Sequence, residues 1–255
     1  MRNVAIIWRK ELRSYFASPI AYLLLTMFAF VFGLFFWVYL RDFVEYGMAA
    51  QMRGQSFPMN VNEDIVRPLL GTAGVIGLFL IPMITMRLFA EEKRTGTIEL
   101  LATSPIRDLE IIIGKWLAAL TLYATMLLFT AVNFAFLFKY GNPDWKPLAI
   151  GYLGLLLQAG GLLAIGTFIS TLTKNQIIAG AATFGICLVL WVVSSVAEFE
   201  TAAWGRALAY TSVLTHFESF AKGVLDIKDA VFYLTVIFVG LFFTSRSMES
   251  LRWRS

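Results

Sequence analysis

The sequence predicts an all-α integral membrane protein with six transmembrane helices. First, 58% of its 255 residues are hydrophobic and 15% are charged, against about 25% charged in soluble domains. Second, the charges separate six apolar stretches. Third, 23 Phe, 9 Tyr and 7 Trp exclude a disordered chain. A single Cys and a single His exclude a disulfide framework and a Cys/His zinc cluster.

A spanning helix needs about 20 predominantly apolar residues. We therefore expect one membrane domain over residues 1–255, with spans at about 20–40, 68–88, 114–138, 147–172, 175–197 and 229–246. The last apolar stretch has only 16 residues, 230–245. Lys228 and Arg246 flank it, and their long side chains can reach both interfaces. A buried helix of a soluble protein is the alternative for such a stretch.

The basic residues predict the orientation. With six spans both termini share one side, and that side collects 13 of the 21 Lys and Arg residues. Basic residues accumulate on the cytoplasmic side of membrane proteins. We expect a bacterial cytoplasmic (inner) membrane protein with both termini in the cytoplasm. The net charge of +4 then reflects topology, and no nucleic-acid partner is expected.

Residues 3–17 predict an amphipathic helix in the plane of the membrane, an elbow before the first span. Its apolar stripe faces away from its basic residues. Glu11 falls toward the apolar side, a position that requires a protein partner. Ser18 and Pro19 are typical of the N-cap and first position of the following helix. A frayed cytoplasmic tail is the alternative. The stripe consists of Val4, Trp8, Leu12 and Tyr15.

Residues 90–106 predict a short cytoplasmic helix between spans two and three. Gly96 ends the helix that leaves the membrane, and Thr95 and Thr97 are N-cap candidates for the next one. Apolar residues beside Glu99 suit a groove on a partner protein. An ordinary solvated loop is the alternative.

On the opposite side we expect residues 41–67 to form a loop or short helices. Residues 198–228 predict amphipathic helices that dip into the outer leaflet. His216 lies there, and a lone His is typical of a surface or packing residue more than of a ligand.

Small residues recur inside the spans. Gly71, Gly74 and Gly77 lack the spacing and strand context of a nucleotide-binding loop and favour close helix packing. Ala181 and Gly185 form a similar pair. We expect Pro82 to kink span two. The amides of Asn133 and Gln158 are expected to face other helices or to line a path. No Asp, Glu, Lys, Arg or His is expected deep in a span.

Motifs for chemistry are absent. Gly114-Lys115 is followed by Trp116, so no phosphate-binding loop of the ATPase type is present. The sequence also has no G-x-S-x-G and no H-E-x-x-H. These absences favour a membrane component that is driven by another protein.

Four motifs resemble the ABC-2 family of ABC-transporter permeases over nearly the whole chain: KELRSYFASPIAY, AEEKRTGTIELLATSPI, TKNQIIAG and HFESFAKGVLDIKD. The second is specific to the superfamily. The last resembles the branch that contains the gliding-motility-associated permease subunit, although nothing in the sequence encodes motility.

The resemblance implies an exporter built from two six-span subunits, as a homodimer or related heterodimer, with separate cytoplasmic ABC ATPase subunits. ATP and Mg²⁺ would bind to those subunits, and this chain would hold no cofactor and have no catalytic or metal site. The elbow and the loop after span two would contact the ATPase. By position, the ATPase-coupling residues are Glu11, Glu91, Glu92, Gly96, Thr97, Glu99 and Leu100.

Spans two and five usually face the dimer axis in this family. That expectation places a second set of residues near the translocation path or dimer interface, namely Gly74, Gly77, Pro82, Ala181 and Gly185. An ATP-independent channel, carrier or membrane anchor of another complex is the alternative function. The sequence does not select among lipid, glycolipid, peptide and polysaccharide as cargo.

Overall fold

The computed structural model describes residues 2–53, 60–98, 106–199 and 212–252. All regular elements within these ranges are helices. The bundle comprises α2 (Pro19–Met52), α3 (Arg67–Thr85), α6 (Asp108–Tyr140), α7 (Trp145–Leu172), α8 (Gln176–Phe199) and α11 (Ile227–Arg252). Four shorter elements accompany it: α1 (Arg2–Ala17), the π-helix η1 (Asn62–Val66), α4 (Ala90–Thr95) and α10 (Val213–Ala221).

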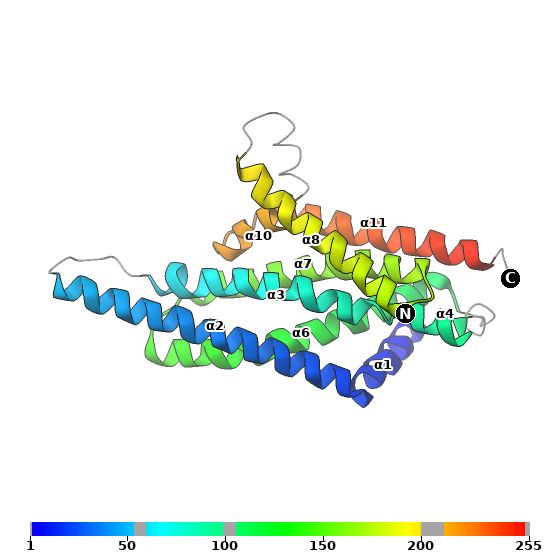
Figure 1. Cartoon of the computed structure of the whole chain (residues 1–255), viewed down its shortest axis with the longest axis horizontal. Coiled ribbons are helices and arrows are strands. Elements are labelled where there is room, and N and C mark those ends of the chain that lie inside the picture. The colour runs from blue at the N-terminus through cyan, green and yellow to red at the C-terminus, as the bar shows by residue number, and fades with distance from the viewer. Residues whose placement is uncertain (1, 54–59, 99–105, 200–211, 253–255) are drawn as a thin grey trace.

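Six helical segments of the described chain are long and apolar enough to cross a membrane. This confirms the predicted fold class. The N-terminal start of α1, the end of α11 and α4 all lie at one end of the bundle, the right-hand end in Figure 1. We call this end the terminal end. An even number of spans requires both termini on one side, as observed.

Helix α7 is the centre of the bundle, because α3, α6, α8, α10 and α11 all pack against it. Its glycines allow this close packing. A Cβ atom at Gly154 would lie 2.5 Å from Phe220 Cβ of α10, and one at Gly161 would lie 3.2 Å from Val236 of α11. At Gly166 it would overlap the side chain of Thr85 in α3. The run GYLGLLLQAGG within α7 therefore sets how closely its neighbours approach.

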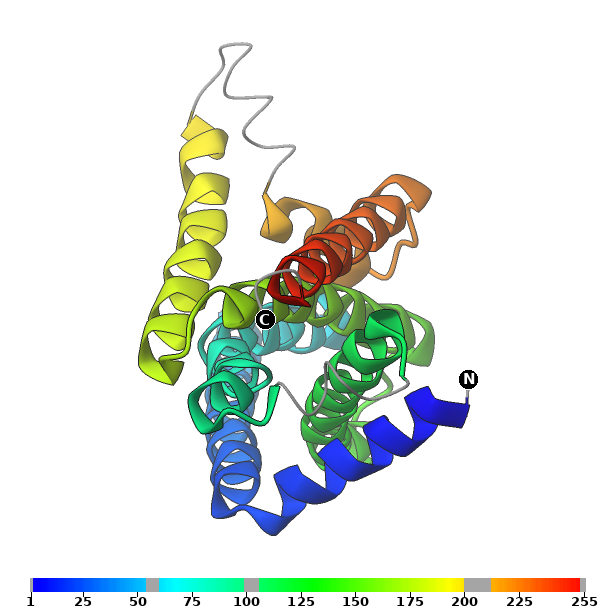
Figure 2. The same ribbon diagram turned by 90° about the vertical axis from the view of Figure 1, so that its right-hand side faces the viewer.

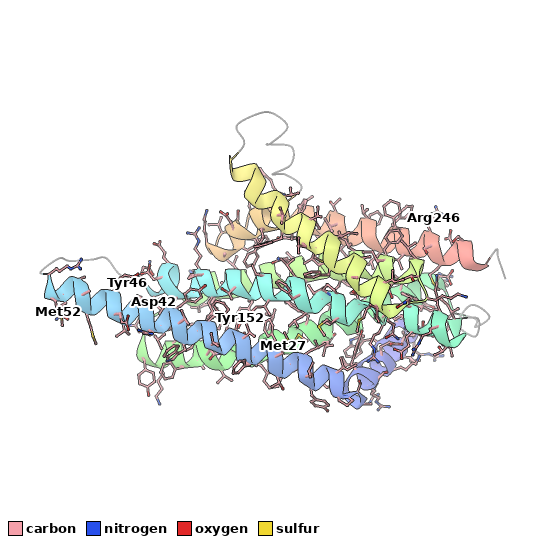
Figure 3. All side chains as sticks on the ribbon, viewed as in Figure 1. Met27, Asp42, Tyr46, Met52, Tyr152 and Arg246 are labelled. Carbon is pink, nitrogen blue, oxygen red and sulfur yellow. The ribbon has the colours of Figure 1, made fainter. Side chains whose placement is uncertain are left out.

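The lateral surface of the bundle is apolar. Phe30, Trp37 and Phe238 expose more than half of their surface, and Met27 also points outward (Figure 3). Helix α8 is the least buried of the six spanning segments, and Figure 2 shows it on the flank of the bundle. An apolar girdle of this kind suits contact with lipid chains or with other membrane helices.

Two expectations about local structure need correction. The predicted loop after residue 40 is wrong over its first part, because α2 stays helical to Met52 and carries Asp42 and Tyr46 beyond the apolar stretch (Figure 3). Span two is interrupted, not only kinked, since α3 ends at Thr85, three residues after Pro82, and α4 begins at Ala90. Pro82 lacks the amide that would bond to the Leu78 carbonyl one turn earlier, whereas the Met86 amide still bonds to the Pro82 carbonyl at 3.0 Å. The break therefore lies beyond the turn that the proline weakens.

Candidate functional site

Helix α1 lies across the terminal end of the bundle and is fastened to α6 (Figures 1 and 2). Its apolar stripe faces this helix, and a Cβ at Gly114 would lie 2.8 Å from Ile7. Trp8 Nε1 donates a hydrogen bond to Thr121 Oγ1 at 2.9 Å. The N-terminal residues thus form a helix that packs on α6, and its position in the plane of the membrane stays a prediction.

The amphipathic pattern required a partner for Glu11, and the structure supplies Lys115. Lys115 Nζ lies 3.2 Å from Glu11 Oε1 of α1 and 2.8 Å from Glu92 Oε1 of α4. The lysine side chain is only 3% exposed, and its ammonium lies 5.2 Å from the centre of the Phe89 ring. We call Glu11, Lys115 and Glu92 the ionic cluster; it joins α1, α4 and α6.

The burial of Lys115 makes the ionic cluster sensitive to change. A buried charge is tolerated only when it is paired, because it has lost its hydration. Here one ammonium serves two carboxylates, and Glu92 Oε2 is buried without a hydrogen-bond partner among the described residues. A small displacement of α4 therefore alters a strong interaction with α6.

Helix α4 is also tied to the centre of the bundle. The amides of Phe89 and Ala90 both donate to Ser170 Oγ of α7, at 3.0 and 3.1 Å. These are the amides that the break in span two leaves without helical partners. Lys93 Nζ donates to the backbone carbonyl of Thr171, whose hydroxyl donates to Ser247 of α11 at 2.8 Å. Movement of α4 thus reaches α6 and α7 directly, and α11 through Thr171 of α7.

Gly96 ends α4 as the sequence predicted. Its φ of 74° is left-handed, a conformation that glycine adopts without a Cβ penalty. The Thr95 hydroxyl donates back to the Glu91 carbonyl at 3.0 Å, and the predicted helix that Thr95 or Thr97 would cap lies mostly outside the described residues. The exposed Thr97 follows, whereas the predicted coupling residues Glu99 and Leu100 lie outside the described residues.

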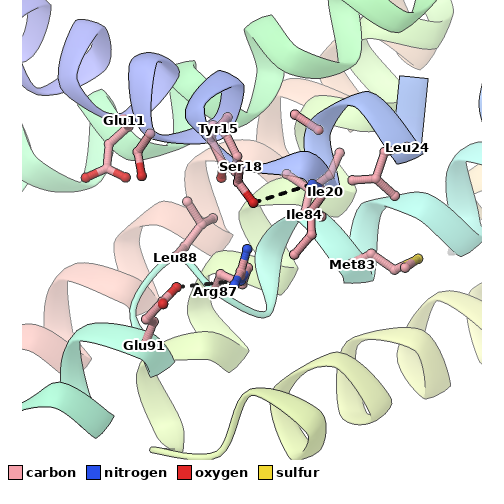
Figure 4. Close-up of a pocket in the computed structure, with 12 residues that line it drawn as sticks. Glu11, Tyr15, Ser18, Ile20, Leu24, Met83, Ile84, Arg87, Leu88 and Glu91 are labelled. Atoms are coloured by element: carbon pink, nitrogen blue, oxygen red, sulfur yellow. Dashed lines mark hydrogen bonds and ion pairs between the residues drawn. The ribbon is translucent and has the colours of Figure 1, made fainter. Parts of the chain in front are cut away.

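A cavity of about 210 Å³ adjoins the ionic cluster between α1, α2, α3 and α4 (Figure 4). Glu11 and Tyr15 line one side, and Arg87 and Glu91 line the other. Burial and the neighbouring carboxylate of Glu11 raise the pKa of the Tyr15 phenol, so this group stays neutral. Three of the predicted coupling residues therefore lie at this cavity or at the ionic cluster beside it, namely Glu11, Glu91 and Glu92.

The predicted path residues fall into two groups. Gly74 and Gly77 are buried within the chain, where their Cβ positions would lie 3.0 Å from the Gln158 amide and from the Tyr123 hydroxyl, respectively. Pro82 is buried as well. Their place near the translocation path or dimer interface stays a prediction. By contrast, Ala181 and Gly185 lie exposed on α8, and a Cβ at Gly185 would meet nothing within 4 Å.

Buried ionisable groups also occur at the opposite end. His216 Nδ1 lies 2.7 Å from Asp229 Oδ1, and the imidazole stacks on the Phe232 ring at 3.9 Å between centroids. Tyr233 donates to the Val213 carbonyl nearby, at 2.6 Å. His216 is thus a packing residue that holds α10 against α11.

Sequence reasoning missed Lys115 and Ser170. Lys115 was counted as a solvated cytoplasmic charge, although an apolar run follows it directly and Glu11 required a partner. These two observations together could have predicted the pairing of Glu11 with Lys115. Ser170 carries no comparable signal, since a serine in a spanning helix usually bonds within its own helix.

The six long apolar helices define a polytopic membrane protein. The chain belongs to the ABC-2 family of transporter proteins, whose family pattern matches residues 5–243. It is 27% identical over 173 residues to the "Probable multidrug ABC transporter permease YbhR" of Escherichia coli K12, and equally to that of Escherichia coli O157:H7. The match covers 65% of this chain and 44% of each relative, so it spans less than half of their length.

Proposed function

We propose that this chain is the permease subunit of an ABC exporter, driven by ATP that a separate nucleotide-binding subunit hydrolyses. Membership of the ABC-2 family supports a transmembrane transporter subunit. The ionic cluster supports the more specific proposal. In it, one buried lysine of α6 pairs with a carboxylate of α1 and with a carboxylate of α4, the short helix after span two. Such a junction suits the transmission of force into the membrane.

In this proposal the terminal end faces the cytoplasm, as the distribution of basic residues predicts. The exposed end of α4 with Arg94, and the exposed Thr97 just after it, contact the nucleotide-binding subunit together with the elbow α1. ATP-driven closure displaces α4, and the ionic cluster passes this displacement to α6. Two packing arrangements of these helices then alternate during transport.

A second permease subunit completes the path. We propose that it packs against α8, whose apolar residues are largely exposed in the single chain, among them Ile177, Val189 and Trp191. Ala181 and Gly185 on this helix allow close approach of another helix. The relatives are named as probable multidrug permeases, which favours drug-like compounds as the cargo. Assignment to the gliding-motility-associated branch stays a prediction from the motif at residues 216–229.

The test is co-purification from native membranes. The solubilised full chain is expected to recover a nucleotide-binding subunit, and the complex is expected to hydrolyse ATP. Arg94→Glu reverses an exposed charge on α4 and is expected to lower recovery, whereas Lys139→Glu, exposed near the other end of α6, leaves it unchanged. Failure to recover any nucleotide-binding subunit would favour the ATP-independent channel, carrier or anchor.

A further inference from the structure

The lining of the cavity beside α1 changes from polar to apolar along the bundle axis. Its deeper wall is apolar and comes from α2 and α3, with Leu24, Met83 and Ile84 (Figure 4). Its rim, nearer the terminal end, carries Arg87 and Glu91 with the hydroxyls of Ser14 and Ser18, as lining residues. Leu24 lies six residues beyond Ser18, which is about 9 Å along a helix. The polarity gradient therefore runs along the expected membrane normal.

Arg87 has unused donor capacity at this rim. Its Nε atom is buried and has no hydrogen-bond partner among the described residues. The nearest carboxylate is Glu91 Oε2 at 3.6 Å, which is beyond a hydrogen bond. A buried charged donor normally has an acceptor. An anionic oxygen that enters the cavity would supply one.

Carboxylates stand on both sides of this guanidinium. Glu91 is 41% exposed and makes only the long contact to Arg87 among the described residues, while Glu11 lines the opposite wall. Glu11 is already paired with Lys115, so Glu91 is the carboxylate that would repel a ligand with only negative charge. A ligand that carries a phosphate and a primary ammonium complements both signs, because the ammonium donates hydrogen bonds to carboxylates and the guanidinium binds phosphate.

We propose that this cavity binds the headgroup of a zwitterionic membrane phospholipid with a primary amine, of the phosphatidylethanolamine type. The phosphate binds Arg87, the ammonium binds Glu91, and the apolar wall holds the first part of the acyl chains. The volume of about 210 Å³ is below the usual 300–1,000 Å³ of drug-sized sites and suits a headgroup. The bound lipid bridges the elbow α1 to α3 and α4.

This proposal goes beyond the transport function and does not depend on it, since lipid binding is measured on the chain without ATP. The purified full chain is delipidated in detergent and then mixed with micelles that contain phosphatidylethanolamine, phosphatidylcholine or phosphatidylglycerol. Thermal stability and native mass spectrometry report binding. Phosphatidylethanolamine is expected to be retained and to raise the melting temperature. Phosphatidylcholine, which has no N–H donor in its headgroup, is expected to bind at least tenfold more weakly.

Variants separate the headgroup contacts from general lipid affinity. Arg87→Gln and Glu91→Gln are each expected to weaken phosphatidylethanolamine binding about tenfold, the usual effect of losing one charge-assisted hydrogen bond. Arg87→Lys keeps the cation and is expected to bind with intermediate affinity. Arg13→Gln changes an exposed charge on α1 and is the matched control, with no expected effect.

Three results would overturn the proposal. The first is equal retention of phosphatidylglycerol and phosphatidylethanolamine. The second is binding that Arg87→Gln and Glu91→Gln leave unchanged. The third is an equal stabilisation by soluble phosphoethanolamine or inorganic phosphate, which would identify an ion site without a lipid.

Discussion

Lys115 of α6 and Glu92 of α4 form an ion pair of 2.8 Å that is buried at the terminal end of the bundle. The two residues belong to helices that the chain connects only through residues 96–107. Their pairing fixes the break in span two against the start of span three. Because Glu11 shares the same ammonium, the elbow is fixed to the same point.

Removing the cation is expected to destabilise this end strongly. Lys115→Met leaves Glu92 without its cation and Glu11 with only the exposed Lys10, at 3.4 Å. Removing one partner of a buried pair typically costs about 3–5 kcal/mol. The free energy of unfolding in detergent measures the effect. The triple variant with Glu11→Gln and Glu92→Gln removes all three charges and is expected to recover most of the loss. Equal destabilisation by the single and triple variants would contradict the ionic role.

Ser170 is expected to hold the start of α4. Ser170→Ala removes the shared acceptor of two buried amides, at a cost of about 1–3 kcal/mol. Hydrogen exchange of residues 89–95 is expected to accelerate, while α8 is unaffected. Thr183→Ala is the matched control, because its buried hydroxyl donates only to the Ala179 carbonyl of its own helix in the described contacts. If exchange at 89–95 stays unchanged in Ser170→Ala, this link does not hold α4.

The glycine face of α7 is expected to be intolerant of larger residues. In Gly166→Ala the new methyl group overlaps Thr85, and such overpacking costs about 1–3 kcal/mol. Thermal unfolding of the purified chain measures the loss. The double variant Gly166→Ala/Thr85→Ala removes the overlapping Oγ1 and Cγ2 atoms of Thr85 but keeps its Cβ, at 2.7 Å. It therefore relieves part of the overlap and is expected to unfold at a higher temperature than Gly166→Ala alone. No difference between the two would show that the helices separate without cost.

Gly185 is expected to behave in the opposite way. A Cβ there meets nothing within the chain, so Gly185→Leu leaves the single chain folded and with unchanged thermal stability in dilute detergent. If α8 contacts a second subunit, the larger side chain lowers dimer formation, which cross-linking or sedimentation measures. Gly33→Leu on α2 is the matched control, since a Cβ at that glycine also meets nothing. Unchanged dimerisation in Gly185→Leu would remove α8 from the interface.

Local patterns predict the helices of this protein better than the contacts between them. The elbow, the cap at Ser18, which accepts from the Ile20 amide, and the break at Gly96 all follow from residues within one or two turns. The six spans follow from charge-free length. These features depend on neighbours in sequence, so a single chain is sufficient to read them.

Local sequence patterns do not predict the contacts between helices that are distant in the sequence. The pairing of Glu11 with Lys115 joins residues 104 positions apart, and that of Ala90 with Ser170 joins residues 80 apart. Periodicity shows that Glu11 lies on the packed face but does not identify its partner. Likewise, the sequence predicts the same packing role for the small residues of α3 and α8, and only the three-dimensional arrangement shows which of them pack inside the chain.

The most direct test of this mechanism measures ATP-coupled transport by a variant in which the ionic cluster is altered. The permease and its co-purified nucleotide-binding subunit are reconstituted in proteoliposomes, and ATP hydrolysis and cargo movement are measured together. Glu92→Gln keeps the shape and a neutral hydrogen-bond acceptor for Lys115. Glu249→Gln is the control, because it alters an exposed ion pair with Arg246 on α11. The account predicts that Glu92→Gln lowers the cargo moved per ATP at least severalfold, while Glu249→Gln has no effect. Equal transport per ATP in wild type and Glu92→Gln would contradict it.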